Sequence, residues 1–372
     1  MFLVLTRKHL ILLLCPLAFI LFWVGSSLCA LWLQCSTPKV IVPESEVFCL
    51  IDDIFHLRNQ ALLQGNLSAL ANLYDRNSRT GIWAYEHQVK KEKYLRNWLY
   101  KQGAKLTVIK SLIRLRQVRP RNDGIRVTLL ASTEYRYVYQ NEPTAINLMR
   151  IGTYHSLDLI QKDEQWQISR EWYTDPFADA LAMKKGQAEA DHSFIPSQKP
   201  RDFSDLNHKR FQAVAYAEEY CGAAANDEQG FKYNPKYRNY NYSGGDCANF
   251  ASQVLHEGGG FRKTYAWNYG KGASRAWVNA NAFNRYMLNS GRGSRIAYGT
   301  YSQVLNSSYQ LLPGDYIAYE KKGKVTHISV VTGADSKGYT FTNSHNADRY
   351  HVPWDLGYGD RGIKFWLVRM NY

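Results

Sequence analysis

Cys247 is the residue whose type and position best fit nucleophilic chemistry. It lies in the run Gly-Gly-Asp-Cys-Ala-Asn-Phe-Ala-Ser-Gln at residues 244–253. The two glycines predict a tight turn, Asp246 stands where a helix N-cap belongs, and apolar residues follow at helical spacing. The positive end of a helix dipole favours the thiolate, which is the form that attacks carbonyl carbon. We therefore expect Cys247 to be a nucleophile on the first turn of a helix.

A histidine further along the chain is a candidate general base for this thiol. Residues 324–331 predict a strand that carries His327, and residues 339–345 predict the next strand. Period-two alternation places Asn343 and His345 on one face of that second strand, so either side chain can orient the imidazole of His327. The pattern predicts a cysteine–histidine pair with a third polar residue that is His345 or Asn343.

The sequence from about Asn207 onward resembles a known family in six segments, namely residues 213–218, 234–237, 244–253, 313–316, 326–331 and 344–346. The resemblance is to the putative amidase domain family, which is similar to CHAP-type and other papain-like cell-wall amidases. It covers a little under half of the chain. It implies a papain-like α+β domain and a cofactor-independent cysteine amidase or peptidase. It also implies Cys247 as nucleophile and His327 as base, with His345 slightly ahead of Asn343 as the orienting residue.

Three further residues are candidates for contacts with substrate or with an oxyanion. The backbone N–H of Cys247 is the expected oxyanion donor, and Tyr242 is the tyrosine best placed to join it, although packing or substrate contact is the favoured interpretation. Trp267 and its asparagine neighbours are of the kind that contact sugars and peptides. Asp246 is favoured as a helix cap over a catalytic acid.

The other histidines and cysteines are weaker candidates. His256 is expected on the helix of the nucleophile but away from its start, and His351 in a loop without a strand to hold it. Cys49 and Cys221 are expected to be free thiols, since nothing in their spacing argues for a disulfide bond. No spacing of cysteine and histidine is typical of a metal site, so we expect no metal and no other cofactor.

The beginning of the chain predicts a membrane segment. Arg7 and Lys8 precede an apolar stretch from about residue 10 to residue 33, which is longer than a typical signal-peptide core and long enough to span a bilayer. Residues 1–42 are therefore expected to be an uncleaved anchor with the remainder outside the cell membrane, or alternatively a cleaved signal peptide. The formal net charge of +14 indicates an anionic environment, and no motif indicates nucleic acid.

The rest of the chain divides into two predicted domains. Residues 43–182 read as helices followed by long strands, an α+β arrangement that resembles the nuclear-transport-factor-like or SnoaL-like cone on architecture and weak local similarity. A structural or ligand-sensing role is favoured for this cone over catalysis. Residues 183–205 are polar and predict an exposed linker, and residues 206–372 form the predicted amidase domain.

Together these features predict an extracytoplasmic cysteine amidase or peptidase that hydrolyses amide bonds in peptidoglycan or another anionic cell-wall polymer. The alternative is a catalytically inactive wall-binding or assembly protein with an amidase-like fold. The same residues would also serve acyl transfer, and the sequence leaves hydrolysis and transfer open.

Overall fold

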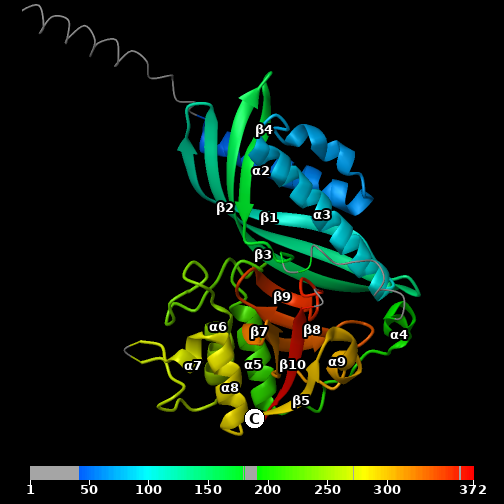
Figure 1. Ribbon diagram of the computed structural model, residues 1–372, viewed down its shortest axis with the longest axis vertical. Coiled ribbons are helices and arrows are strands. Elements are labelled where there is room, and N and C mark those ends of the chain that lie inside the picture. The colour runs from blue at the N-terminus through cyan, green and yellow to red at the C-terminus, as the bar shows by residue number, and fades with distance from the viewer. Residues whose placement is uncertain (1–41, 179, 181–190, 271, 360–361) are drawn as a thin grey trace, which may run out of the picture.

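The computed structural model describes residues 42–178, 180, 191–270, 272–359 and 362–372. Within these residues the chain is a mixed α+β protein built on one ten-stranded antiparallel sheet (Figure 1). The strand order is β1-β2-β3-β9-β8-β7-β6-β10-β5, and β4 pairs with β3. The predicted membrane segment at residues 10–33 lies outside the described residues. In the part of the chain that is described, no helix is both long enough and apolar enough to cross a bilayer.

The N-terminal half consists of helices followed by four strands, as predicted. Its elements are α2 (Glu44–Gln64), the 3-10 helix η1 (Leu67–Leu73), α3 (Arg79–Gln102), β1 (Ala104–Pro120), β2 (Gly124–Tyr139), β3 (Glu142–Lys162) and β4 (Gln165–Tyr173). Gly65 ends α2 in the left-handed conformation, with φ 70°, which explains the predicted break in the helical pattern. We call this half the cone.

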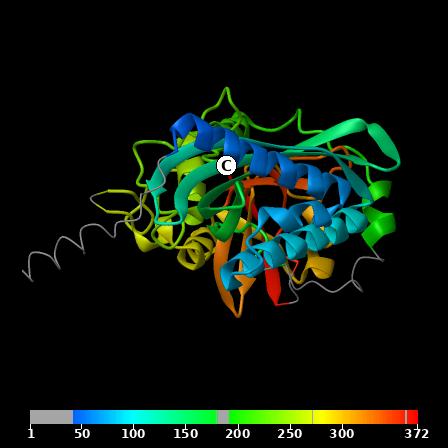
Figure 2. The ribbon, with the colours of Figure 1, turned by 90° about the horizontal axis from the view of Figure 1, so that it is seen from above.

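The helices of the cone cover one face of its strands, as the view from above shows (Figure 2). Val47 and Ile51 of α2 pack with Val127 of β2 and Leu157 of β3 in a buried apolar cluster. Side chains alternate across a strand, so the neighbouring residues of β2 and β3 point to the opposite face. We call the face of the sheet that lies under the helices the inner face, and the opposite face the outer face.

The C-terminal half surrounds the remaining strands with short helices. Its elements are α4 (Asp191–Ser197), α5 (His208–Glu219), α6 (Cys247–Gln253), the π-helical turn η3 (Val254–Gly258), α7 (Arg275–Val278), α8 (Ala280–Asn289), β5 (Gly293–Gly299), α9 (Tyr301–Ser308), β6 (Tyr316–Lys321), β7 (Lys324–Ala334), β8 (Thr340–Ser344), β9 (Asp348–Pro353) and β10 (Ile363–Met370). The segment predicted as an exposed linker contains α4, whose Ile195 is fully buried. His351 lies in β9, so the expectation that no strand holds it is wrong.

One sheet joins the two halves. Strand β3 of the cone pairs with β9 of the C-terminal half at Gly152↔Asp348 and Ile151↔Arg349. Buried polar contacts strengthen the junction, because Asp355 accepts hydrogen bonds from the Trp98 indole and from Lys101 of α3. The cone is therefore fixed against the C-terminal half at β9.

Candidate active site

Cys247 is the first residue of α6, as the sequence predicts, and only 5% of it is exposed. The backbone N–H of Ile328 in β7 acts on its thiol in the sense that favours the thiolate. Burial raises the pKa of the Cys247 thiol to about 11, and the negative charge of Asp246 adds to this effect against the opposing hydrogen bond from Ile328. Burial thus opposes the thiolate that the helix start favours, and a pKa of about 11 keeps the thiol protonated at neutral pH.

The helix that carries Cys247 is anchored by two tryptophans. The indole Nε1 of Trp267 donates to Ser252 Oγ at 2.9 Å, and that of Trp277 donates to Asn249 Oδ1 at 2.9 Å. Trp267 is fully buried in the cluster that also contains Cys247. Trp267 therefore positions α6, and its expected contact with substrate is not supported by this placement.

His327 lies in β7 beside a β-bulge. It pairs with Tyr319 of β6, whereas Val325 pairs with Glu320, so Thr326 is the extra residue. The ring of His327 stacks on Tyr358 at 5.5 Å between centroids, and its Nε2 atom is buried without a hydrogen-bond partner among the described residues. Burial, assisted by the positive charge of Arg349, lowers the pKa of His327 to about 3, so the ring is neutral.

Cys247 and His327 are close in the fold but lie on opposite sides of β7. Ile328 packs in the cluster that contains Cys247, and His327 contacts Tyr319, which belongs to the cluster on the other face of the sheet. In the described part of the chain no hydrogen bond joins the thiol to the imidazole. Proton transfer between them therefore requires a change in the backbone or side chain of His327, and the bulge at Thr326 is the irregular point of the strand.

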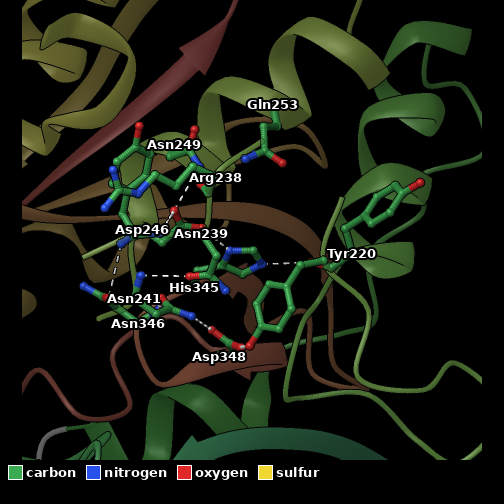
Figure 3. A network of polar contacts seen from close by, with 12 residues as sticks. Tyr220, Arg238, Asn239, Asn241, Asp246, Asn249, Gln253, His345, Asn346 and Asp348 are labelled. Carbon is green, nitrogen blue, oxygen red and sulfur yellow. Dashed lines mark hydrogen bonds and ion pairs between the residues drawn. The ribbon is translucent and has the colours of Figure 1, made fainter. Parts of the chain in front are cut away.

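His345 forms a buried ion pair with Asp246 (Figure 3). Its Nδ1 lies 2.6 Å from Asp246 Oδ2, and its Nε2 donates to the carbonyl oxygen of Tyr220 at 2.8 Å. Burial alone would lower the pKa of His345, but the charge of Asp348, together with the charge and hydrogen bond of Asp246, raises it. Both ring nitrogens are donors in this arrangement, so His345 is an imidazolium and has no free nitrogen to accept a proton or to orient His327.

Asn343 is also committed to partners other than His327. Its Oδ1 accepts from Thr332 Oγ1 at 3.1 Å and from the His351 backbone N–H at 2.8 Å, and its Nδ2 donates to the Ala217 carbonyl at 3.1 Å. The structure thus brings His345 and Asn343 to the side of the sheet that faces α6. It does not show the expected hydrogen bond from either residue to His327.

Asp246 ties the loop before α6 to the helix and to β8. Its Oδ1 accepts from the Tyr240 backbone N–H and from Asn249 Nδ2, both at 2.9 Å. Its side chain makes no capping hydrogen bond to the backbone of α6, so the predicted capping role is replaced by the ion pair with His345. Nothing in the sequence spacing reveals this pair, because its members lie 99 residues apart.

A pocket of about 320 Å³ opens between the two halves beside His327. The cone contributes Leu130, Gly152, Tyr154, Thr174 and Asp175, and the C-terminal half contributes Ala223, Tyr233, Asn241, Tyr242, Thr326, His327, Asn346, Ala347, Asp348 and Tyr358. Tyr242 is 69% exposed and packs edge-on against Tyr154. Tyr242 lies in the wall of the pocket, which is compatible with its predicted place beside the site. The residues that the cone contributes to the pocket could not be recognised in the sequence.

Asp348 forms the floor of the pocket where the two halves join. It accepts hydrogen bonds from the Ala223 backbone N–H at 2.7 Å, from the Tyr233 hydroxyl and from Asn241 Nδ2. Burial raises the pKa of its carboxyl group despite the nearby charge of His345. Figure 3 shows Asn241 and Asn346 next to the Asp246–His345 pair, so amide groups lie between this pair and the pocket.

The C-terminal half is similar to a known protein family. Residues 207–368 match the model of the family described as "Putative amidase domain". Two proteins of Bacillus subtilis (strain 168) are similar to the chain. The uncharacterized protein YhbB is 27% identical over 184 residues, which are 46% of this chain and 51% of YhbB. The uncharacterized protein YjcM is 30% identical over 154 residues, 38% of this chain and 32% of YjcM.

The chain thus spans about half the length of YhbB and a third of YjcM. Among solved structures, the intermembrane space region of chloroplast protein ARC6 aligns with 36% of this chain and 98% of its own, at 9% identity and a TM-score of 0.25. The family match coincides with the half that holds Cys247, His327 and His345. The match thus covers the residues in which the sequence motifs indicate an amidase domain.

Proposed function

We propose that the chain is a cysteine-dependent amidase or peptidase in which Cys247 attacks an amide carbonyl and His327 moves the proton. The observation that carries the proposal is the position of Cys247 at the start of α6, where the backbone N–H of Ile328, the residue after His327, acts on its thiol. Of the two histidines expected at the site, His327 is the one whose Nε2 is unpartnered among the described residues, since both nitrogens of His345 are occupied.

The reaction starts from a neutral thiol and a neutral imidazole. A rearrangement of His327 first brings its ring to the Cys247 side of β7. As the sulfur bonds to the carbonyl carbon, its proton then passes to a ring nitrogen of His327, and the backbone N–H of Cys247 is the candidate donor to the oxyanion. The tetrahedral intermediate breaks its C–N bond, and the amine leaves with the proton from His327. Water then attacks the thioester carbonyl and gives a proton to His327. The C–S bond breaks as that proton returns to the Cys247 sulfur, which releases a carboxylic acid and restores the thiol.

The proposed substrate is an amide bond in peptidoglycan, on the outer face of the cell membrane. Three observations support this choice: the likeness of the motifs to cell-wall amidases, the net charge of +14, and the basic residues that precede the apolar stretch at residues 10–33. An acyl transfer to an amine would use the same residues, and the product distinguishes it from hydrolysis.

A second candidate function is that of an inactive protein that binds the cell wall. The specific observation in its favour is the placement of Cys247 and His327 on opposite sides of β7, both neutral. Under this alternative the pocket binds the same polymer and no bond is cut.

Product analysis separates the two functions. Purified peptidoglycan is incubated with the chain, with Cys247→Ala and with His256→Ala, and the released fragments are weighed by mass spectrometry. His256→Ala is the control for a substitution outside the proposed cysteine–histidine pair, because the His256 ring is hydrogen-bonded to the backbone carbonyl of Phe261. The proposal expects new fragments from the wild type and the control but none from Cys247→Ala. Binding without fragments in all three would establish the inactive protein instead.

A further inference from the structure

The outer face of the cone sheet is a surface that the amidase family does not include. The family match begins at residue 207, and the cone precedes it. In the sheet register, Arg114 of β1, Leu130 of β2 and Tyr154 of β3 form one outward row, and Ser156 of β3 and Trp172 of β4 belong to the next. The inner face under α2 and α3 carries the apolar core, whereas Arg114 and Trp172 on the outer face are exposed.

Three aromatic side chains run from this face into the mouth of the pocket. Trp172 and Tyr154 pack edge-on with ring centroids 6.1 Å apart, and Tyr154 and Tyr242 do so at 5.5 Å. Trp172 is 54% exposed and Tyr242 is 69% exposed. Tyr154 and Tyr242 also line the pocket that contains His327. We call Trp172, Tyr154 and Tyr242 the aromatic strip, and it crosses from the cone to the amidase domain.

The same outward rows are rich in positive charge. In the described sheet, the outward rows from that of Arg114 to that of Arg170 contain a single carboxylate, Asp158. The same rows contain four arginines, namely Arg114, Arg119, Arg126 and Arg170. Asp158 is engaged by Arg126, with Nε to Oδ1 at 2.5 Å. Arg114 and Arg170 are exposed. The guanidinium groups beside the strip therefore complement a ligand that carries carboxylates.

The interior of the pocket has a different character. Its described lining contains tyrosine hydroxyls and asparagine amides, two carboxylates, Asp175 and Asp348, and no lysine or arginine. Hydroxyl and amide groups suit hydrogen bonds to sugar hydroxyls and peptide amides. A backbone with a phosphate at every unit would be repelled by carboxylates in this lining, which therefore disfavours nucleic acid.

We propose that the aromatic strip and the arginines beside it bind the sugar chain of a carboxylated glycan whose peptide branch enters the pocket at His327. The inference rests on the proposed function for the identity of the bond that is cut. The apolar C–H faces of sugar rings pack on aromatic rings, and the carboxylates pair with the arginines. The cone is thus the part of the chain that recognises glycan, and the amidase domain acts on the attached peptide.

Binding measurements on the Cys247→Ala chain test the inference without requiring cleavage. The probes are soluble peptidoglycan fragments that retain several disaccharides and the same stem peptides free of sugar. Removing the Trp172 ring by Trp172→Ala is expected to weaken binding of the glycan-bearing probe roughly three- to tenfold, by analogy with the energy of aromatic pairs. Binding of the free peptides by the Trp172→Ala chain is expected to stay unchanged.

Trp83→Ala is the matched control, because Trp83 is also a tryptophan of the cone and is 53% exposed, but it lies on α3. The inference is overturned if Trp172→Ala and Trp83→Ala have equal effects, if the free peptides lose affinity as much as the glycan, or if a single-stranded oligonucleotide binds the strip more tightly than the glycan. A wild-type chain that cuts nothing while Trp172→Ala still loses glycan binding would refute the proposed hydrolysis and leave the glycan site standing.

Discussion

The reactivity of the Cys247 thiol follows directly from its burial. The pKa of Cys247 is about 11, compared with an ordinary value of 9.0 for a thiol. At pH 8 this increase in the pKa lowers the fraction of thiolate by about 100-fold, because each pKa unit changes the ratio of thiolate to thiol tenfold. Alkylation by iodoacetamide proceeds through the thiolate, so Cys247 is expected to react about 100-fold more slowly than an unperturbed accessible thiol at that pH.

The chain carries its own reference thiols for this experiment. Cys49 is exposed, and Cys221 is buried with its pKa raised to about 12. The folded protein is treated with iodoacetamide between pH 7 and pH 10, and the modification of each cysteine is followed by mass spectrometry of its peptide. Cys49 should react first, Cys247 much later and Cys221 last, and the Cys247 rate should still rise tenfold per pH unit at pH 10.

The variant His327→Ala makes the test specific for the state of the pair. Because His327 is neutral and makes no hydrogen bond to the thiol in the described structure, its removal should leave the alkylation rate of Cys247 unchanged while it abolishes hydrolysis. A Cys247 that reacts as fast as Cys49 at pH 7, and loses this reactivity in His327→Ala, would show a preformed thiolate–imidazolium pair and refute the reasoning.

Three predictions concern stability. Folding lowers the pKa of His327 from 6.5 to about 3, so the stability that its neutral form contributes is complete above pH 6.5 and is lost as pH falls. Urea unfolding should therefore show that the free energy of unfolding falls by about 2–3 kcal/mol between pH 7 and pH 4.5. The variant His327→Gln should not show this fall. The pKa of His345 is raised instead, so the stability from its ion pair with Asp246 is present below pH 6.5 and is lost as pH rises. In the same assay Asp246→Asn should lower the free energy of unfolding by about 3–5 kcal/mol at pH 6 and by less at pH 9. An equal loss at both pH values would contradict the ion pair. Asp355→Asn leaves Lys101 buried without its anion and should lower the unfolding free energy by about 3–5 kcal/mol in calorimetry, and a change below 1 kcal/mol would count against this junction of the two halves.

Long periodic elements of this chain are predictable from sequence because the pattern itself is local. The four strands of the cone, the break at Gly65 and the helix start at Cys247 follow from alternation, from turn residues and from the apolar spacing after Asp246. The position of Cys247 and its helix could therefore be predicted before any coordinates.

The geometry around Cys247 is not predictable in the same way, because it depends on non-local pairing. The bulge at Thr326 sets the face of β7 to which His327 points, and one extra residue in a strand reverses that face. The pairing of β3 with β9 and the bond between Asp246 and His345 join residues far apart in the chain. Burial, which decides the pKa of both Cys247 and His327, is likewise a property of the whole fold.

The most direct test of the central claim is to trap the acyl group on Cys247. The chain is mixed with peptidoglycan fragments, quenched in acid within the first turnovers, digested and mapped by mass spectrometry, with Cys247→Ala beside it. The account predicts a thioester-linked fragment on the peptide that contains Cys247, and no adduct on Cys49 or in the variant. Fragment release that continues in Cys247→Ala, or release without any adduct on Cys247, would contradict it.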